Sequence, residues 1–315
     1  MRSVTRDWLH RGLQVIAQCL PRRLFTEPTL FRAYERRGWH ITPVGFYQPI
    51  PDTRTLPGNI WDAQSAMTGV DLNEVGQLAL LEEFRNKFGS EYGLLPASSG
   101  DPAQFHFGQK AFGRVDAEVL YSMVRRFKPQ RIIEIGSGMS TLLTAQALRR
   151  NAHEGFPCAF TAIEPYPSET LRSEIPGLSE LVVERVENVP LERFEELGAS
   201  DILFIDSSHV IRLGGDVLYE YLEVIPRLRP GVLVHSHDIF LPAHYPREWV
   251  LDRRWFWTEQ YLLQALLAFN RTFEVLWAGH FMHLHHADQL KIAFPGYTGE
   301  PPGSFWMRRA PRREG

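Results

Sequence analysis

Short apolar runs alternate with helical patterns through the middle and later parts of the chain. The mostly apolar runs lie at residues 132–135, 160–163, 181–183, 202–205 and 232–234. Between the last two runs, apolar residues recur at helical spacing at Val217, Leu218, Tyr221, Leu222 and Ile225. Strands that alternate with helices are typical of parallel βαβ units. The pattern therefore predicts an α/β fold with a doubly wound sheet and helices on both faces.

Polar residues or glycines follow each of these predicted strands. They are Gly136, Ser137 and Gly138, then Glu164, then Glu187 and Asn188, then Asp206 and His209, and finally His235, His237 and Asp238. In open parallel sheets, a ligand binds beyond the carboxyl ends of the strands. Because these ends share one edge of the sheet, the sequence predicts one ligand site there.

The turn after the first strand has the features of a nucleotide-binding loop. Gly136 and Gly138 have no side chains, so a ligand can approach the backbone closely. The helical stretch that starts at Ser140 offers free backbone N–H groups. We expect Glu134 to orient this loop, and Ser140 to act either as the helix N-cap or as a ligand contact.

Three segments carry a resemblance to a known family. Glu-Ile-Gly-Ser-Gly at 134–138, Phe-Ile-Asp-Ser-Ser-His at 204–209 and Pro-Gly-Val-Leu-Val-His-Ser-His-Asp at 230–238 resemble the class I S-adenosylmethionine (SAM)-dependent methyltransferases. The similarity is greatest to the branch with Asp-x-x-His and His-Asp at the ends of strands four and five. It covers about residues 112–295, and Thr141 stands where nicotinamide-binding proteins have a third glycine. The resemblance implies a Rossmann-like, seven-stranded sheet of order 3-2-1-4-5-7-6, with SAM across its first two strands.

The resemblance also implies a set of cofactor contacts. Glu164 ends the second strand, where a carboxylate can accept hydrogen bonds from both ribose hydroxyls. The glycine loop would approach the amino-acid part of SAM, and the residues after the third strand would contact adenine. The expected SAM-binding residues are Glu134, Gly136, Ser137, Gly138, Ser140, Glu164, Glu187, Asn188 and Asp206.

Two acids and their neighbouring histidines are the candidate reaction centre. Asp206 and Asp238 end adjacent strands, so their carboxylates are expected to converge with imidazoles beside them. We expect Asp206, His237 and Asp238 to hold Mg²⁺ or another divalent metal, as some O-methyltransferases of this shape do. The alternative is a metal-free site in which His209 or His237 is the general base. In either case the predicted catalytic residues are Asp206, His209, His237 and Asp238.

An aromatic segment at 239–261 directly follows Asp238 and is expected to roof the substrate pocket. Its candidate acceptor contacts are Tyr245, Trp249, Trp257 and Glu259. Further along, four histidines cluster at 280–286, between a sixth strand at 273–277 and the seventh. Their alternation is interpreted as a solvated hairpin rather than as a metal site.

The chain is expected to have three parts. Residues 1–110 form a helical and loop extension that could cover the substrate side or simply pack against the sheet. Residues 111–300 form the methyltransferase domain, and residues 301–315 form a basic, solvated tail. A length of 315 residues is sufficient for this arrangement.

Composition narrows the functional classes. The formal net charge of −3 argues against a dominant electrostatic attraction to nucleic acid. No apolar run approaches the roughly 18 residues of an integral membrane segment. The two cysteines, Cys19 and Cys158, are not a disulfide framework, so we expect a cytoplasmic setting. A small-molecule acceptor is the expected partner, and a homo-oligomer is left open.

The sequence therefore predicts a SAM-dependent methyltransferase that methylates a small-molecule hydroxyl, such as that of a sugar or a secondary metabolite. N-methylation by the same fold is the nearest alternative. A mononuclear iron oxygenase with two histidines and a carboxylate is a second alternative. A non-catalytic SAM-binding protein is a third. The oxygenase need not bind SAM, whereas the non-catalytic protein would bind it without turnover.

Overall fold

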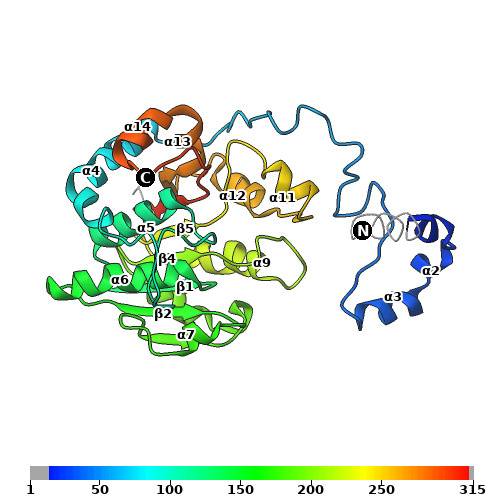
Figure 1. The fold of residues 1–315 in the computed structure, drawn as a ribbon, viewed down its shortest axis with the longest axis horizontal. Coiled ribbons are helices and arrows are strands. Elements are labelled where there is room, and N and C mark those ends of the chain that lie inside the picture. The colour runs from blue at the N-terminus through cyan, green and yellow to red at the C-terminus, as the bar shows by residue number, and fades with distance from the viewer. Residues whose placement is uncertain (1–13, 312–315) are drawn as a thin grey trace, which may run out of the picture. The chain divides into compact units, whose positions relative to one another are not determined.

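The structure is a computed structural model that describes residues 14–311, and it is drawn in Figure 1. The chain divides into two compact units, Met1–Ile60 and Trp61–Gly315. In the first unit, α2 (Arg23–Thr26) is followed by α3 (Pro28–Glu35). Proline suits the first turn of α3 because its missing N–H would have no partner there. Residues 39–60 contain neither helix nor strand, as their proline and aromatic content predicts.

The second unit is built on one seven-stranded sheet. Its strands are β1 (Arg131–Ile135), β2 (Ala159–Ile163), β3 (Glu180–Val182), β4 (Ile202–Ile205), β5 (Leu233–Ser236), β6 (Phe273–Ala278) and β7 (Phe305–Arg309). They lie in the order β3-β2-β1-β4-β5-β7-β6. The first five strands are parallel, and β7 runs antiparallel to both β5 and β6. The predicted α/β fold and strand order are confirmed.

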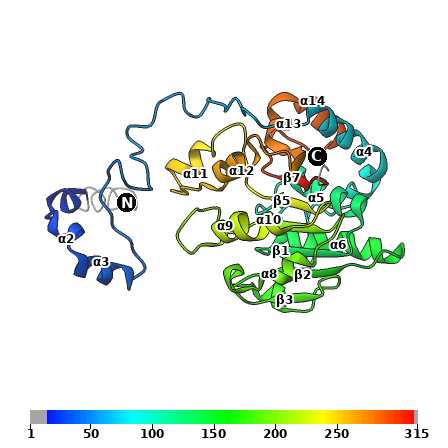
Figure 2. The ribbon, with the colours of Figure 1, turned by 180° about the vertical axis from the view of Figure 1, so that it is seen from behind.

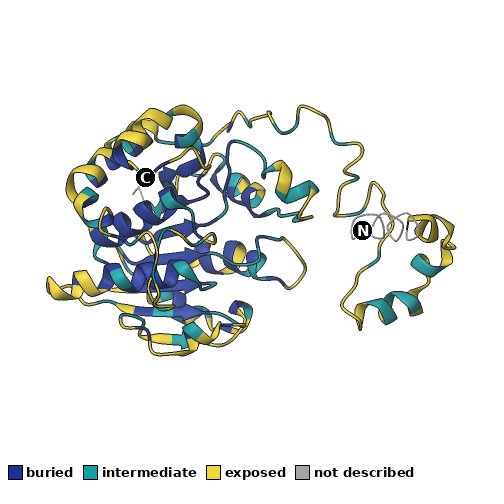
Figure 3. Cartoon of the chain, viewed as in Figure 1, coloured by how far each residue is buried: buried dark blue, intermediate teal, exposed yellow. Residues whose placement is uncertain are grey.

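Helices cover both faces of this sheet (Figures 1 and 2). Side chains alternate across a strand, so Ile132 and Phe204 pack on one face while Ile133 and Leu203 pack on the other. The first face carries α4 (Glu74–Tyr92), α5 (Arg114–Phe127), α6 (Met139–His153), α13 (Gly279–His285) and α14 (Ala287–Ala293). The second carries α8 (Leu191–Glu195), α9 (Asp216–Tyr219), a π-helical turn at Glu220–Val224, α10 (Ile225–Arg227) and α12 (Glu259–Leu267). Figure 3 shows burial concentrated in the strands and on the helix faces against them.

Three short helical segments complete the second unit. They are α7 (Glu169–Arg172), a 3-10 turn at Val186–Asn188, and α11 (Arg247–Leu251). In the part of the chain that the structure describes, no helix has both the length and the apolarity to cross a membrane.

The predicted boundaries at 110 and 300 do not match the structure. Helix α4 belongs to the second unit, because Leu81 and Phe84 are buried in the same core as α5 and α6. Residues Phe305–Arg309 are not a solvated tail but strand β7, whose Phe305 and Trp306 are fully buried. The sheet domain therefore begins before residue 110 and continues beyond residue 300.

The solvated hairpin predicted around 280–286 is also wrong. Helices α13 and α14 occupy that connection, and His280 is buried against Phe240 with the ring centroids 5.3 Å apart. Gly279, His280 and Met282 are buried in α13, so this part of the connection lies in the core and not in solvent.

Candidate active site

A cavity of about 580 Å³ opens at the carboxyl ends of β1, β2 and β4. Its walls include four of the predicted cofactor residues, namely Gly136, Glu164, Glu187 and Asp206. The lining also includes Pro165, Tyr166, Arg185, Ser207, Ser208, Arg212 and Asp216. The cavity therefore lies where ligands bind in open α/β sheets.

The two glycines of the first turn have different requirements. Gly136 has a φ of +80°, and a Cβ atom there would lie 1.8 Å from the carbonyl oxygen of Asp206. Gly138 has extended backbone with a φ of −179°, and a Cβ atom there would meet no atom within 4 Å. Close packing against the end of β4 thus explains why residue 136 is a glycine. The open space beside Gly138 is available to a ligand.

Glu134 and Ser140 support the turn from beneath. The Ser140 hydroxyl donates to Glu134 Oε1 at 2.6 Å, and both side chains are buried. Burial raises the pKa of Glu134 to about 8. The hydroxyl of Ser140 is therefore neither an N-cap nor exposed to the cavity, and Gly138 occupies the N-cap position of α6.

Glu164 joins the loops that follow the first two strands. Its Oε2 accepts a hydrogen bond from the N–H of Ser137 at 3.2 Å, and its Oε1 accepts one from the N–H of Tyr166 at 2.7 Å. The carboxylate therefore lies beside the glycine turn at the cavity wall, as a ribose-binding residue should. Tyr166, which is 85% exposed at this wall, was not predicted from the sequence, although it stands two residues after Glu164.

The predicted adenine contacts separate in the structure. Glu187 lines the cavity and pairs with Arg185. Asn188 is not among the lining residues, and its amide donates to Glu184 Oε1 at 2.9 Å. The side chain of Asn188 is therefore engaged locally.

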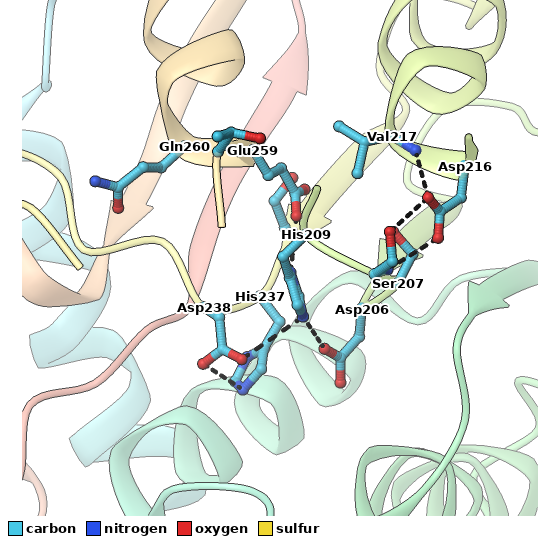
Figure 4. Close-up of polar contacts among 12 residues, drawn as sticks. Asp206, Ser207, His209, Asp216, Val217, His237, Asp238, Glu259 and Gln260 are labelled. Carbon is cyan, nitrogen blue, oxygen red and sulfur yellow. Dashed lines mark hydrogen bonds and ion pairs between the residues drawn. The ribbon is translucent and has the colours of Figure 1, made fainter. Parts of the chain in front are cut away.

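Asp206, His209 and Asp238 converge, as Figure 4 shows, and of these three Asp206 lines the cavity. Nε2 of His209 lies 3.4 Å from Asp206 Oδ1 and 3.6 Å from Asp238 Oδ2. One ligand atom from each of the three residues lies within 4.8 Å of the others. His209 and Asp238 both have positive φ values, 61° and 54°, so each adopts a left-handed turn conformation at its strand end.

The electrostatics of this cluster favour the charged forms of His209 and Asp206, whereas burial raises the pKa of Asp238 above its ordinary value. Burial would by itself lower the pKa of His209, but hydrogen bonds from its ring to Asp206 and Glu259 raise it well above the ordinary value. Burial also acts to raise the pKa of Asp206, yet the neighbouring His237 and His209 lower it to about 2. The gap between the two aspartates is therefore suited to a positive charge.

His237 does not join this cluster. Its ring stacks on Phe112 with centroids 4.8 Å apart, and its Nε2 is 3.7 Å from Asp238 Oδ1. The predicted ligand set of Asp206, His237 and Asp238 is therefore corrected, because His209 supplies the converging imidazole nitrogen. His235 lies beside His237, with the ring centroids 5.7 Å apart.

The aromatic segment contributes both half-buried and buried residues. Trp249, Trp255 and Trp257 are half-buried, and the rings of Trp255 and Trp257 stack 4.8 Å apart. Tyr245 is only 3% exposed, and its hydroxyl accepts a hydrogen bond from the N–H of Gln260. This burial contradicts the predicted acceptor contact at Tyr245.

Glu259 is likewise not positioned to contact an acceptor. Its side chain is fully buried, and Oε2 lies 2.8 Å from Nδ1 of His209. The predicted substrate contact at Glu259 is therefore wrong, and the residue lies behind His209 instead (Figure 4).

Comparisons with known proteins place these features in context. Residues 133–239 match the family model described as a methyltransferase domain. A protein of Archaeoglobus fulgidus, described as uncharacterized, is 31% identical over 181 residues. That match covers 53% of this chain and 80% of the relative.

Solved structures with related architecture include an O-methyltransferase from Bacillus cereus in complex with SAH. The two chains are 16% identical with a TM-score of 0.35, over 74% of this chain and 91% of that one. A second is the MycE methyltransferase of the mycinamycin pathway in complex with Mg, SAH and mycinamycin VI. It is 14% identical with a TM-score of 0.35, over 75% of this chain and 56% of that one. Similarity at this level carries no information on the acceptor or metal of this chain.

The Asp-x-x-His and His-Asp branch stays a prediction. The broader family is shown. The region that matches the methyltransferase model contains the glycine turn, Glu164 and Asp206 at the ends of β1, β2 and β4. The strand order is also the one that the resemblance implied. The chain thus belongs to the class I SAM-dependent methyltransferases.

Proposed function

We propose that this enzyme transfers the methyl group of SAM to a hydroxyl oxygen of a small molecule, such as a sugar or a secondary metabolite, with the assistance of a divalent cation. The observation that supports this most is the convergence of Asp206, His209 and Asp238 within 4.8 Å. Asp206 also lines the cofactor cavity, so the metal and the methyl donor would share one wall.

The donor set fits a divalent cation. Two carboxylates and one imidazole are common ligands of Mg²⁺, Mn²⁺ and iron, and oxygen donors favour the first two. Ligand atoms at about 2.1 Å from such an ion are about 3 Å apart when they are adjacent in an octahedron. The distances of 3.4 and 3.6 Å from His209 Nε2 to the two carboxylates are close to this spacing. When bound, the cation would lower the pKa of a coordinated acceptor hydroxyl.

The cavity suggests how SAM would be held. The open side of Gly138 suits the amino-acid part, and Glu164 suits the ribose hydroxyls. Tyr166 and Glu187 flank the region expected to hold adenine. When bound there, SAM would supply the methyl group on its sulfonium for transfer to the acceptor oxygen and would leave as S-adenosylhomocysteine. The hydroxyl proton of the acceptor leaves toward solvent or a nearby base, and positioning supplies much of the rate.

The tryptophans of the aromatic segment are the proposed acceptor surface. The ring of Trp257 lies 4.4 Å from that of His209, so an acceptor stacked beside it would lie near the aspartates. Trp249 packs edge-on against Trp257 at 5.1 Å and extends this surface. Indole rings bind sugar and aromatic faces by stacking.

Metal binding can be measured before the acceptor is known. We expect the purified, EDTA-treated protein to bind one Mn²⁺ per chain, measured by electron paramagnetic resonance. Asp206→Asn or Asp238→Asn should abolish this binding, whereas His237→Asn, which changes the adjacent histidine outside the cluster, should preserve it. Asp238→Asn should still bind SAM by calorimetry. A folded wild-type protein that binds SAM but no Mn²⁺ would leave the metal-free mechanism, with His209 or His237 as the general base.

A further inference from the structure

The two ring nitrogens of His209 have different surroundings. Nε2 faces the gap between Asp206 and Asp238, whereas Nδ1 lies 2.8 Å from Oε2 of Glu259. Figure 4 shows Glu259 approaching the ring from the side opposite the aspartates. A carboxylate beside Nδ1 accepts the N–H of that nitrogen. In the neutral ring the proton therefore stays on Nδ1, and the lone pair of Nε2 is directed at the proposed metal position.

Glu259 is itself held by a chain of buried hydrogen bonds. The hydroxyl of Tyr221 donates to Glu259 Oε1 at 2.9 Å and lies 2.9 Å from Oγ of Ser236. Since a tyrosine hydroxyl has a single hydrogen, Ser236 must donate to the tyrosine oxygen. All three side chains are at most 1% exposed. The carboxylate of Glu259 therefore has a partner on each oxygen and little freedom to turn.

The same helix start also holds the backbone of His209. The carbonyl oxygen of His209 accepts hydrogen bonds from the N–H groups of Thr258 and Glu259, at 2.9 and 3.1 Å. The Thr258 hydroxyl accepts a third bond, from the N–H of Ile211 at 2.8 Å. These contacts fix a residue whose φ of 61° is uncommon for residues other than glycine. Contacts from Thr258 and Glu259, at the start of α12, therefore hold both the ring and the backbone of His209 in place.

A local irregularity brings Tyr221 into this network. The turn at Glu220–Val224 is π-helical, and single π turns inside α-helices are frequent at functional sites. Glu220 and Tyr221 are consecutive residues, and both are fully buried toward the site. Glu220 contacts Ser207 and has no hydrogen bond to His209, whereas Tyr221 reaches Glu259.

We propose that Glu259 is a positioning residue that, with Tyr221 and Ser236 behind it, fixes His209 so that Nε2 can bind the divalent cation. This proposal rests on the proposed metal-assisted function. Such partners of a metal-binding histidine set the ring orientation and the donor strength of the free nitrogen. Glu259 would act through His209 without touching SAM, metal or acceptor.

Mn²⁺ titration of the full-length protein is the first test. Loss of a carboxylate partner of a metal-binding histidine weakens metal affinity about 10- to 100-fold. We expect this range for Glu259→Ala and a smaller loss for Glu259→Gln, whose amide can still accept from Nδ1. The matched control is Glu220→Gln, which changes an equally buried glutamate without a bond to His209 and should leave the affinity unchanged. Calorimetric SAM binding and circular dichroism verify that each variant is folded.

The ring hydrogen bond provides a second test that does not depend on the metal. In the EDTA-treated wild type, we expect a slowly exchanging, downfield ring N–H signal in the proton NMR spectrum, identified by its loss in His209→Asn. It should disappear in Glu259→Ala, persist in Glu220→Gln, and move upfield in Glu259→Gln. If Glu259→Ala does not fold, the Glu259→Gln shift and its weaker Mn²⁺ binding decide the question.

The two tests separate the failure of this proposal from the failure of the proposed function. A wild type without Mn²⁺ binding but with the NMR signal would refute the metal and retain Glu259 as the residue that orients His209. Unchanged Mn²⁺ affinity in folded Glu259 variants would refute the positioning role and retain the metal site. Absence of the wild-type signal would also refute the positioning role.

Discussion

Gly136 and Asp206 meet at a point where the backbone leaves no room for a side chain. A Cβ atom on Gly136 would lie 1.8 Å from the Asp206 carbonyl oxygen, and the φ of Gly136 is +80°. This contact fixes the glycine turn of β1 against the end of β4. The cofactor loop and the proposed metal ligand Asp206 are therefore held at a constant separation.

Alanine at the two glycines of the turn should affect different properties: stability at Gly136 and SAM affinity at Gly138. Gly136→Ala should lower the free energy of unfolding by about 1–3 kcal/mol, because the backbone must shift to admit the methyl group. Gly138→Ala meets no atom within 4 Å and should leave the melting temperature unchanged. Its methyl group enters the proposed ligand space, so SAM affinity should fall roughly tenfold, equivalent to ~1.4 kcal/mol. Normal SAM binding by Gly138→Ala would show that the amino-acid part of SAM does not lie beside Gly138.

Glu164→Ala should weaken SAM binding by about 1.5–3 kcal/mol, the range for hydrogen bonds to a charged group. The carboxylate joins the N–H groups of Ser137 and Tyr166, so its removal also loosens the cavity wall. Isothermal calorimetry measures the loss. Asn188→Ala is the control, because its amide is bonded to Glu184 and is not part of the lining, and it should bind SAM as the wild type does.

The aromatic segment should separate into binding and structural residues. Once an acceptor is found, Trp249→Ala should raise its KM while the affinity for SAM and the melting temperature change little, because the indole is half-buried. Tyr245→Ala should instead lower the free energy of unfolding by about 3 kcal/mol, since the side chain is 3% exposed. Steady-state kinetics and thermal unfolding distinguish the two. Equal KM changes without any loss of stability would assign Tyr245 to the acceptor surface after all.

Glu134 should make stability depend on pH. Burial raises its pKa from 4.5 to about 8 in the folded protein, so the folded state keeps a proton that the unfolded state has lost. The contribution to stability is complete below pH 4.5 and decreases as the pH rises toward 8, with a slope of about 1.4 kcal/mol per pH unit. Glu134→Gln should remove this slope, and the exposed Glu300→Gln should not. Urea unfolding at pH 6 and pH 8 is the measurement, and equal slopes in wild type and Glu134→Gln would contradict it.

The sheet could be predicted because its strands are short apolar runs with polar residues at their ends. Ile132, Phe160 and Ile202 follow directly from this pattern. The resemblance implied a seventh strand, but its place at Phe305–Arg309 could not be predicted, because Arg308 and Arg309 give this segment the composition of a basic tail. Strand β7 forms because its backbone pairs with both β5 and β6, while Phe305 and Trp306 pack into the cores on opposite faces of the sheet.

The two acids of the candidate metal site were predicted from the sequence, but the histidine that lies between them was not. His237 was the predicted ligand, whereas the structure places His209 there. Asp206 and Asp238 follow from the strand ends. His209 and His237 are equivalent in the sequence, since each lies close to one of these acids. Their difference depends on Glu259, which is 50 residues after His209, and on Phe112, which holds the ring of His237. Such distant contacts leave no local periodicity.

The position of β7 also has a consequence for synthesis. It is the last strand to be made, yet it lies inside the sheet, between β5 and β6. While a ribosome is still translating residues before 305, β6 has no neighbour, and the edge of β5 stays open to other chains. An unpaired strand edge of this kind makes partly made chains prone to aggregation. The last step of assembly inserts a strand between two existing ones, rather than adding one at an edge.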